Sequence, residues 1–496
     1  MSTNMVWWTI AIYIILSLFI AFLSRRGKQN NMESYFLGDR KLGGFVSALS
    51  YSATTYSAFM LVGLAGLTYA GGVGAFGFEI IYFMGVSLVA FFGPRFWLVG
   101  KKYGYVTPSE MLGDRYNNKK VAMVASIASC IFLIPYSAVQ LAGVGYLLSG
   151  MTNNAISFST GVIIATILAI VFSYIAGIRS VAWTDSLQAM FMIITSTLVV
   201  IMIVKGLGGF TGFFDTLQTE HPKWLTVPGN GYFNFLTFLG LTIPWFFFSI
   251  SNPQVSQRLF MPSSLKSLRR MLMGFLIFGF IYTIVSVVWG FSAVVMFPDL
   301  ETADLATPKI LSSELVPPIL GVIVMVGILA AAVSTIDSIL LTLSSLFARD
   351  VYGNISNTRN DSKQLLVGKI FIPVIALLAF LFAQSNISLI AVLSVAASAG
   401  LLVIVPSIIG AFFWKRGTAA GSIVSVIVSG LVVIYLELAK VKPLDLASGL
   451  WGLFISTVLF IIVSLLTKAP TEKANEFLTY VRTELSKINK KTKASN

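Results

Sequence analysis

Residues 44–70 read GFVSALSYSATTYSAFMLVGLAGLTYA, an apolar segment with a dense polar stretch inside it. A helix crosses a hydrocarbon core with about 20 residues, so the segment is long enough to span a membrane. The polar stretch 50–57 is costly in lipid unless it lines a cavity. Unwinding there would expose carbonyl and hydroxyl oxygens, which suit a small alkali cation. Small residues that allow close helix packing are the alternative interpretation.

The composition places most of the chain in an apolar environment. Of the 496 residues, 56% are hydrophobic and only 11% are charged, a balance that a water-exposed surface does not tolerate. Helices are required because backbone polar groups in lipid must bond internally. The sequence predicts an all-α polytopic membrane protein with about thirteen spans, at 6–23, 44–70, 74–98, 121–149, 157–176, 183–204, 232–252, 271–296, 316–347, 366–384, 387–413, 419–438 and 448–467.

The net charge of +14 is explained by topology and gives no reason to expect a nucleic-acid partner. If the N-terminus lies outside, all but five of the 34 Lys and Arg residues fall in cytoplasmic loops or the tail, as the positive-inside rule requires. The exceptions are Lys205, Lys223, Lys309, Lys440 and Lys442. We therefore predict a multi-pass plasma-membrane protein with a cytoplasmic C-terminus. The tail 468–496 is expected to be an amphipathic surface helix or a solvated segment.

A second interrupted helix is predicted at residues 249–254, which read SISNPQ. Pro253 removes a backbone donor and disfavours helical geometry at Asn252, so the span should break or end there. This break lies five spans after the one at 50–57. Such a spacing is what two inverted five-helix repeats would produce.

Two further polar clusters contain carboxylates within the predicted spans. Residues 330–338 read AAAVSTIDS, and Ser334, Asp337 and Ser338 share a helical face. Asp185 lies in the segment WTDS at 183–186, where a carboxylate that stabilises a helix N-terminus is the alternative interpretation. Intramembrane carboxylates are costly without a counter-ion, so these clusters favour a cation site.

Glu79 is another acid within a predicted span. Either it contacts a solute, or it is a structural acceptor near an aqueous mouth. The aromatic run 245–248, WFFF, is either a lid over a solute or lipid-facing packing. The one histidine, His221, lies in a predicted outside loop, and no metal-ligand or nucleophile motif appears. The sequence therefore predicts a protein that is not an enzyme.

Several segments resemble the sodium:solute symporter family, which includes proline and pantothenate permeases and sodium/sugar cotransporters. The most specific are AGIRSVAWTDSLQ at 176–188 and NPQVSQR at 252–258, and 331–335 is similar to the serine-rich sodium helix. The resemblance implies a leucine-transporter-like core of inverted repeats. It divides the chain into an N-terminal helix and loop (1–43), a first repeat (44–204), an outside loop (205–231), a second repeat (232–413), two additional helices (414–467) and a basic tail (468–496).

The resemblance also implies Na⁺ as the coupling ion, with no organic cofactor. Its ligands would be Ala53, Tyr56, Ala331, Ser334 and Thr335. A possible second cation or proton site would use Asp185, Asp337 and Ser338. Asp337 departs from the serine expected from relatives, so a second Na⁺, a bound proton and an inert arrangement are the alternatives. Solute contacts would come from Thr55, Ser57, Met60, Glu79, Gln140, Trp245 and Phe248.

The predicted function is Na⁺-coupled symport of a small organic solute by alternating access. A small carboxylate, an amino acid or a vitamin-like acid is favoured over a sugar, because Met60 replaces a polar sugar ligand. The alternatives are a proton-coupled carrier of the same fold, or a solute-sensing or channel-like protein. The expected partners are the solute and the lipid bilayer, with the monomer as functional unit.

Overall fold

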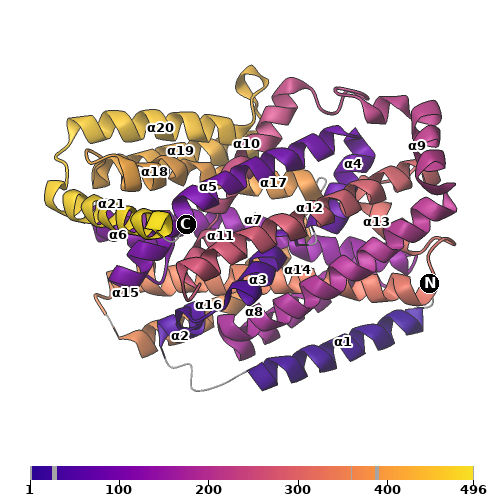
Figure 1. The fold of residues 1–496 in the computed structure, drawn as a ribbon, viewed down its shortest axis with the longest axis horizontal. Coiled ribbons are helices and arrows are strands. Elements are labelled where there is room, and N and C mark those ends of the chain that lie inside the picture. Colours follow the sequence, from indigo (N-terminus) through magenta and orange to yellow (C-terminus); the bar gives the residue numbers. More distant parts are fainter. Residues whose placement is uncertain (1–2, 25–30, 58, 359, 386–389, 495–496) are drawn as a thin grey trace.

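The computed structural model of the protein describes residues 3–24, 31–57, 59–358, 360–385 and 390–494. Within these ranges the elements are helices and helical turns, and the one β contact is an isolated bridge between Leu42 and Pro262. The long helices run roughly along the long axis of the molecule (Figure 1). The predicted all-α fold is confirmed. The start of the predicted span 387–413 and the basic residues Arg25, Arg26, Lys28 and Arg359 lie outside the described residues.

Ten helical segments of the described chain are long and apolar enough to cross a membrane. They belong to α1 (Thr3–Ser24), α5 (Gly74–Tyr103), α7 (Lys119–Met151), α8 (Phe158–Gly206), α12 (Leu265–Met296), α14 (Pro318–Leu346), α16 (Asp361–Ala383), the run of α17 (Ile390–Gly400), η7 (Leu401–Ile404) and α18 (Val405–Phe413), α19 (Ala419–Ala439) and α20 (Ser448–Leu466). Two bent helix pairs and the shorter apolar segment Phe158–Tyr174 account for the other predicted spans. Short helices connect them: α2 (Met32–Leu37), α6 (Pro108–Arg115), α9 (Gly209–Glu220), α13 (Ala306–Leu311) and α15 (Gly353–Ile355).

Helix α8 joins two of the predicted spans. The sequence predicts two spans, 157–176 and 183–204, separated by a loop around Arg179; the structure has two helices, with the apolar segments Phe158–Tyr174 and Gly177–Gly206, which meet at a kink at Gly177 without a loop. Gly177 has φ 58° and ψ 171°, a conformation that is essentially restricted to glycine. The direction of the chain therefore changes at a single residue, and helical geometry resumes directly after it.

Both predicted helix breaks are present, but the first lies at the end of the polar stretch 50–57, because the chain is helical up to Thr55 and the helix ends at Tyr56. The first separates α3 (Gly44–Thr55) from a π-helical turn, η2 (Phe59–Leu64), and α4 (Ala65–Gly71), and the two parts are bent by 49°. The second separates α10 (Phe235–Ser251) from α11 (Pro253–Ser256) and η4 (Gln257–Phe260), with a bend of 41°. Asn252 at this break has an extended backbone, φ −86° and ψ 112°, as expected for a residue before proline.

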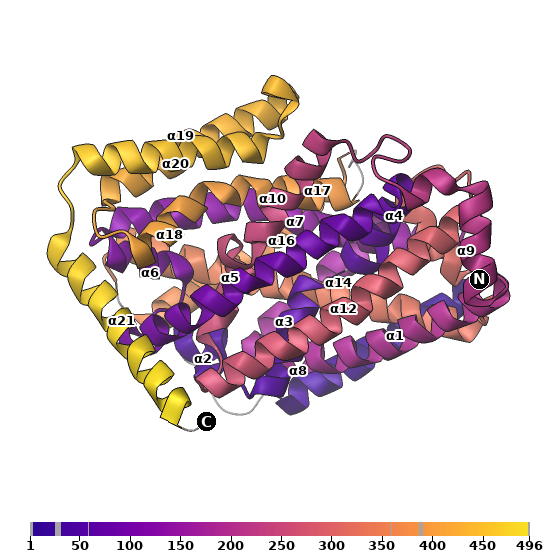
Figure 2. The same cartoon turned by 45° about the horizontal axis from the view of Figure 1, so that its top comes forward.

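The two broken helices lie in the interior of the bundle. Helix α3 packs against α12, α8 and α14, while α10 packs against α5 and α17. Helix α1 lies along α8 on one side of the molecule, and the paired helices α19 and α20 lie on the opposite side (Figure 2). The labelled chain ends lie toward opposite ends of the long axis (Figure 2).

The tail forms an amphipathic helix, α21 (Thr471–Ala494), which packs against protein. Phe477 is fully buried, and its ring centroid lies 6.1 Å from that of Tyr103 and 5.6 Å from that of Phe412. Lys473 forms an ion pair of 3.0 Å with Asp114 of α6. The apolar face that the sequence predicts therefore covers the ends of α5 and α18.

Candidate ion and solute site

The first break leaves the last turn of α3 available for contacts outside the helix. Tyr56 has φ −92° and ψ 75°, and its N–H donates to Ser52 O over 2.6 Å. Ser57 Oγ accepts a hydrogen bond of 3.2 Å from Phe59 N–H beyond the break. Carbonyl groups at a helix C-terminus lack the donors of a following turn. One of them, Ala53 O, accepts instead a hydrogen bond from the Thr335 hydroxyl of α14 over 3.1 Å.

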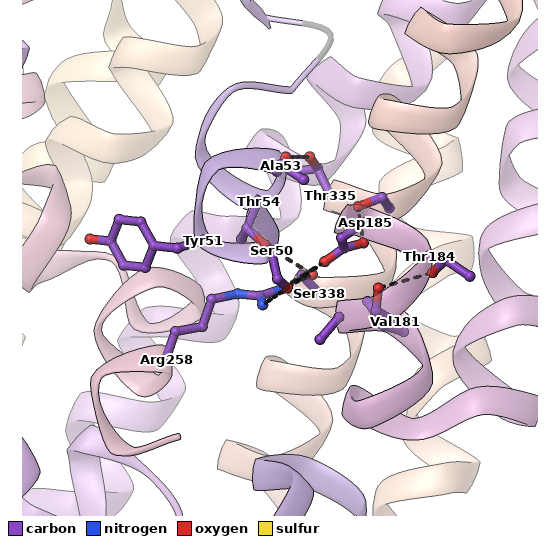
Figure 3. Close-up of polar contacts among 12 residues, drawn as sticks. Ser50, Tyr51, Ala53, Thr54, Val181, Thr184, Asp185, Arg258, Thr335 and Ser338 are labelled. Atoms are coloured by element: carbon purple, nitrogen blue, oxygen red, sulfur yellow. Dashed lines mark hydrogen bonds and ion pairs between the residues drawn. The ribbon is translucent and has the colours of Figure 1, made fainter. Parts of the chain in front are cut away.

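Hydroxyl groups of α14 line the face that meets α3. Ala331, Ser334, Thr335 and Ser338 are all buried, and their spacing of three and four residues places them along one side of the helix. The Ser338 hydroxyl lies 3.3 Å from that of Thr54. Figure 3 shows that the Thr335 and Ser338 contacts join the end of α3 to the middle of α14. Of the five predicted Na⁺ ligands, Ala53 and Thr335 are thus in direct contact.

Asp185 of α8 accepts hydrogen bonds from three directions. Ser50 Oγ donates over 2.8 Å, Ser334 Oγ donates to the other carboxylate oxygen, and Arg258 Nη2 lies 3.4 Å away. The Arg258 and Asp185 side chains are only 4% and 0% exposed. Arg258 also donates to Ser50 Oγ, and to Ser338 Oγ over 2.6 Å (Figure 3). Asp185 therefore has a protein cation as its counter-ion.

Arg258 is a member of this polar cluster that the sequence analysis missed. Its position after the second break placed it among the basic residues of a predicted cytoplasmic loop, but the structure buries it. Residues Gln257–Phe260 continue as a turn of helix, η4, beyond Pro253 and direct the side chain into the bundle. The available signal was the intramembrane Asp185, because a buried carboxylate needs a counter-charge.

Asp337 makes its hydrogen bond away from this cluster. Ser173 Oγ of α8 donates to Asp337 Oδ1 over 3.0 Å. Asp337 also lines a small pocket with Tyr13 and Ser17 of α1 and Gln188 of α8. The predicted trio is therefore divided: Ser338 and Asp185 share contacts with Arg258, and Asp337 contacts Ser173.

Two of the predicted solute contacts, Trp245 and Phe248, belong to a packed group of rings. The ring centroid of Trp245 lies 4.8 Å from that of Phe248 and 4.8 Å from that of Phe59. It lies 5.7 Å from the ring of Phe78 and 5.9 Å from that of Tyr82. We call these five residues the aromatic box. All five are buried, so the run at 245–248 is only partly lipid-facing.

Buried polar atoms without hydrogen-bond partners occur in the aromatic box itself and on helices α5 and α7, which contribute to it or contact it. Glu79 is fully buried, and neither of its carboxylate oxygens makes a hydrogen bond, although the Trp245 indole lies beside it. Both side-chain polar atoms of Gln140 and the hydroxyls of Tyr82 and Tyr136 are also buried without partners. Buried polar groups are ordinarily hydrogen-bonded, and exceptions of this kind call for an explanation such as a ligand.

The remaining predicted solute contacts lie at the first break. The Thr55 hydroxyl donates to Tyr51 O over 2.8 Å, and Ser57 caps the backbone beyond the break. Met60 is buried in η2. The two hydroxyls are therefore already bonded to the backbone of their own segment, unlike Glu79 and Gln140.

A bundle of membrane-length helices, in which two broken helices meet a buried hydroxyl-rich helix, defines a secondary transporter and not an enzyme. The chain belongs to the sodium:solute symporter family, whose model matches residues 35–429.

Curated relatives extend over nearly the whole chain. The sequence is 27% identical to a sodium/proline symporter of Staphylococcus aureus, over 97% of this chain and 94% of the relative. It is 25% identical to the uncharacterized symporter YodF of Bacillus subtilis (strain 168), over 92% of each chain.

Solved structures share the fold. A Na⁺-coupled sialic acid symporter, solved in a substrate-bound outward-open state, matches with a TM-score of 0.78 and 21% identity, over 94% of this chain and 98% of its own. The nucleobase-cation-symport-1 transporter Mhp1, in a closed conformation, matches with a TM-score of 0.59 and 13% identity, over 92% and 99%. The leucine-transporter-like fold that the sequence predicts is confirmed.

Proposed function

We propose that this protein couples the entry of Na⁺ to the uptake of a small organic solute across the plasma membrane. The observation that carries the proposal is the contact of Thr335 Oγ1 with Ala53 O. It joins the broken end of α3 to the buried hydroxyl face of α14. Membership of the sodium:solute symporter family supports the same function.

The Na⁺ ligands in this proposal are the oxygens of Ala53, Tyr56, Ala331, Ser334 and Thr335. The donor set fits the ion, because Na⁺ is a hard cation and these residues offer backbone carbonyl and hydroxyl oxygens. When bound, the ion would supply a positive charge that attracts oxygens of both helices.

The chain's own residues supply the coupling in this proposal. Ala53 and Thr335 belong to different helices, so a ligand of both favours the conformation in which α3 and α14 are close. A ligand shifts a conformational equilibrium only through its differential affinity for the two states. Moving each charge inward also gains about 2.3 kcal/mol per 100 mV.

At the second predicted site, we propose that Arg258 serves as a tethered cation. Its guanidinium contacts Asp185 and Ser338, which are two of the three residues predicted for a second cation or proton. A second external cation at Asp185 would require Arg258 to move away. Asp337, with its separate contact to Ser173, stays a predicted member of such a site.

The proposed solute contacts are Thr55, Ser57, Met60, Glu79, Gln140, Trp245 and Phe248. The unpaired atoms of Glu79 and Gln140 beside the aromatic box support this assignment. The sodium/proline symporter among the relatives supports an amino acid as one candidate solute. The two five-helix repeats at 44–204 and 232–413, and an N-terminus outside the cell, are part of the same proposal.

Uptake into proteoliposomes tests the proposal. A labelled panel of amino acids, monocarboxylates, pantothenate and sugars is supplied with an inward Na⁺ gradient or an inward H⁺ gradient. We expect Na⁺-driven accumulation that is lost in the Ser334→Ala/Thr335→Ala double variant. Accumulation driven by protons alone and unchanged in that variant would overturn the sodium assignment. Equilibration without accumulation would indicate a channel-like or sensing protein.

A further inference from the structure

We propose that the solute carries a positively charged nitrogen, which binds between the Glu79 carboxylate and the aromatic box. The inference rests on the proposed transport function and specifies the chemical class of its solute. It separates amines, amino acids and betaines from sugars and simple carboxylates.

The first argument is the lack of a counter-charge for Glu79. Its side chain is fully buried in α5, and both oxygens lack hydrogen bonds. None of the ion pairs among the described residues includes Glu79. A buried carboxylate without a partner is strongly unfavourable. A cationic group on the solute would supply the missing partner.

Asp185 provides an internal comparison. It is equally buried, but it receives Arg258 and two serine hydroxyls. The fold thus supplies a cation and donors where a carboxylate is structural. Among the described residues, Glu79 has no cation, and the one donor beside it is the Trp245 indole, which makes no hydrogen bond to either oxygen. This is the arrangement expected of a carboxylate whose cationic partner arrives from solution.

The second argument is the chemistry of the aromatic box. Each of the other four ring centroids of the aromatic box lies within 6 Å of that of Trp245. The centroids of Phe59 and Phe78 are also 6.3 Å apart. Aromatic faces carry partial negative charge and attract cations, above all ammonium groups. A solute anion in this position would be repelled by both the ring faces and Glu79.

The third argument concerns the other end of the solute. Gln140 and Tyr136 lie one turn apart on α7, and their buried polar atoms have no partners. The ring of Tyr136 lies 6.0 Å from that of Phe248, a member of the aromatic box. A phenol and an amide offer neutral donors to a carboxylate or hydroxyl. A small zwitterion would therefore satisfy both groups of unpaired atoms.

Matched pairs of isosteric solutes test the proposal with the purified full-length protein in Na⁺. Glycine betaine is compared with 3,3-dimethylbutyrate, and proline with cyclopentanecarboxylate, by ligand-induced thermal stabilisation over a concentration series. We expect the member of at least one pair that has a cationic nitrogen to bind about tenfold or more tightly than its isostere, which corresponds to about 1.4 kcal/mol of attraction to the carboxylate and the ring faces. Glu79→Gln should abolish that preference, and Glu79→Asp should retain part of it.

The outcomes separate this inference from the transport proposal. Equal or tighter binding of the isosteres that lack the cationic nitrogen, or no binding by any compound with a cationic nitrogen, overturns the inference. A parallel series without solute measures stabilisation by Na⁺ in the wild type and in Ser334→Ala/Thr335→Ala. If Na⁺ does not stabilise even the wild-type protein, the transport proposal itself is overturned. Glu79→Gln removes an unpaired buried charge, so the fold should tolerate it, and gel filtration checks this.

Discussion

Arg258 and Asp185 form an ion pair in the interior of the bundle, with Nη2 3.4 Å from Oδ2 and both side chains at most 4% exposed. The pair joins η4, beyond the second helix break, to α8, and Ser50 of α3 contacts both partners. One buried charge pair therefore connects three of the elements that surround the proposed ion site.

Breaking this pair should destabilise the protein strongly. Arg258→Gln leaves Asp185 as a buried charge without a cation, which costs about 3–5 kcal/mol in comparable cases. The double variant Arg258→Gln/Asp185→Asn removes both charges and should recover much of the loss. Thermal unfolding of the wild type, both single variants and the double variant forms a complete cycle. Additive effects of the two substitutions would contradict the pairing.

Thr335→Ala should weaken the response to sodium. The variant removes the hydroxyl that contacts Ala53 O. We expect the Na⁺ concentration for half-maximal uptake to rise roughly tenfold, equivalent to about 1.4 kcal/mol, whereas Thr335→Ser should stay near the wild type. Thr342→Ala is the matched control, since Thr342 is also buried on α14 but lies about two turns away. Equal shifts in the Thr335 and Thr342 variants would contradict the assignment.

Gly85→Ala should disturb the contact between α5 and α10. A Cβ atom at Gly85 would overlap the backbone oxygen of Phe246, so one of the helices must move. Overpacking of this kind costs about 1–3 kcal/mol. The contact at Phe246 lies close to Trp245 and Phe248. Gly77→Ala on the same helix has its nearest contact at 3.6 Å and serves as the control. Thermal unfolding and uptake should separate the two variants; similar behaviour would refute the close approach.

Asp304 should make stability depend on pH. It lies in η5 (Ala303–Leu305), between α12 and α14, and burial raises its pKa to about 7 despite a hydrogen bond of 3.1 Å from Ile390 N–H. Because the folded state favours the protonated acid, the stability contributed by this group is greatest below the unfolded pKa. It is lost progressively as pH rises from about 4 to about 7.

Asp304→Asn should remove this part of the pH profile, because the amide resembles the protonated acid in having no charge. Thermal unfolding between pH 4 and 8 should show the wild type losing stability relative to the variant as pH rises. A difference between wild type and variant that stays constant over this range would contradict a raised pKa.

The sequence predicted the spans and both breaks because their signals are local. A bilayer requires about 20 apolar residues per helix, and Pro253 removes a backbone donor wherever it stands. The polar stretch 50–57 and the face of Ser334 and Ser338 were visible for the same reason. The fold and the approximate place of the candidate site could therefore be predicted before any contact was known.

Which polar groups pair with one another was decided by the tertiary structure alone. Arg258 and Asp185 are 73 residues apart in the chain, and Arg258 was predicted to lie in a loop. The sequence grouped Asp337 with Asp185, and it gave no sign that Asp337 contacts Ser173 instead. The lack of a hydrogen-bond partner for Glu79 also could not be read from its sequence neighbours. Hydropathy determines that a segment is a buried helix, but contacts of about 3 Å depend on the rotation of each helix about its axis and on its packing. Those quantities are set by the whole bundle, and no single segment encodes them.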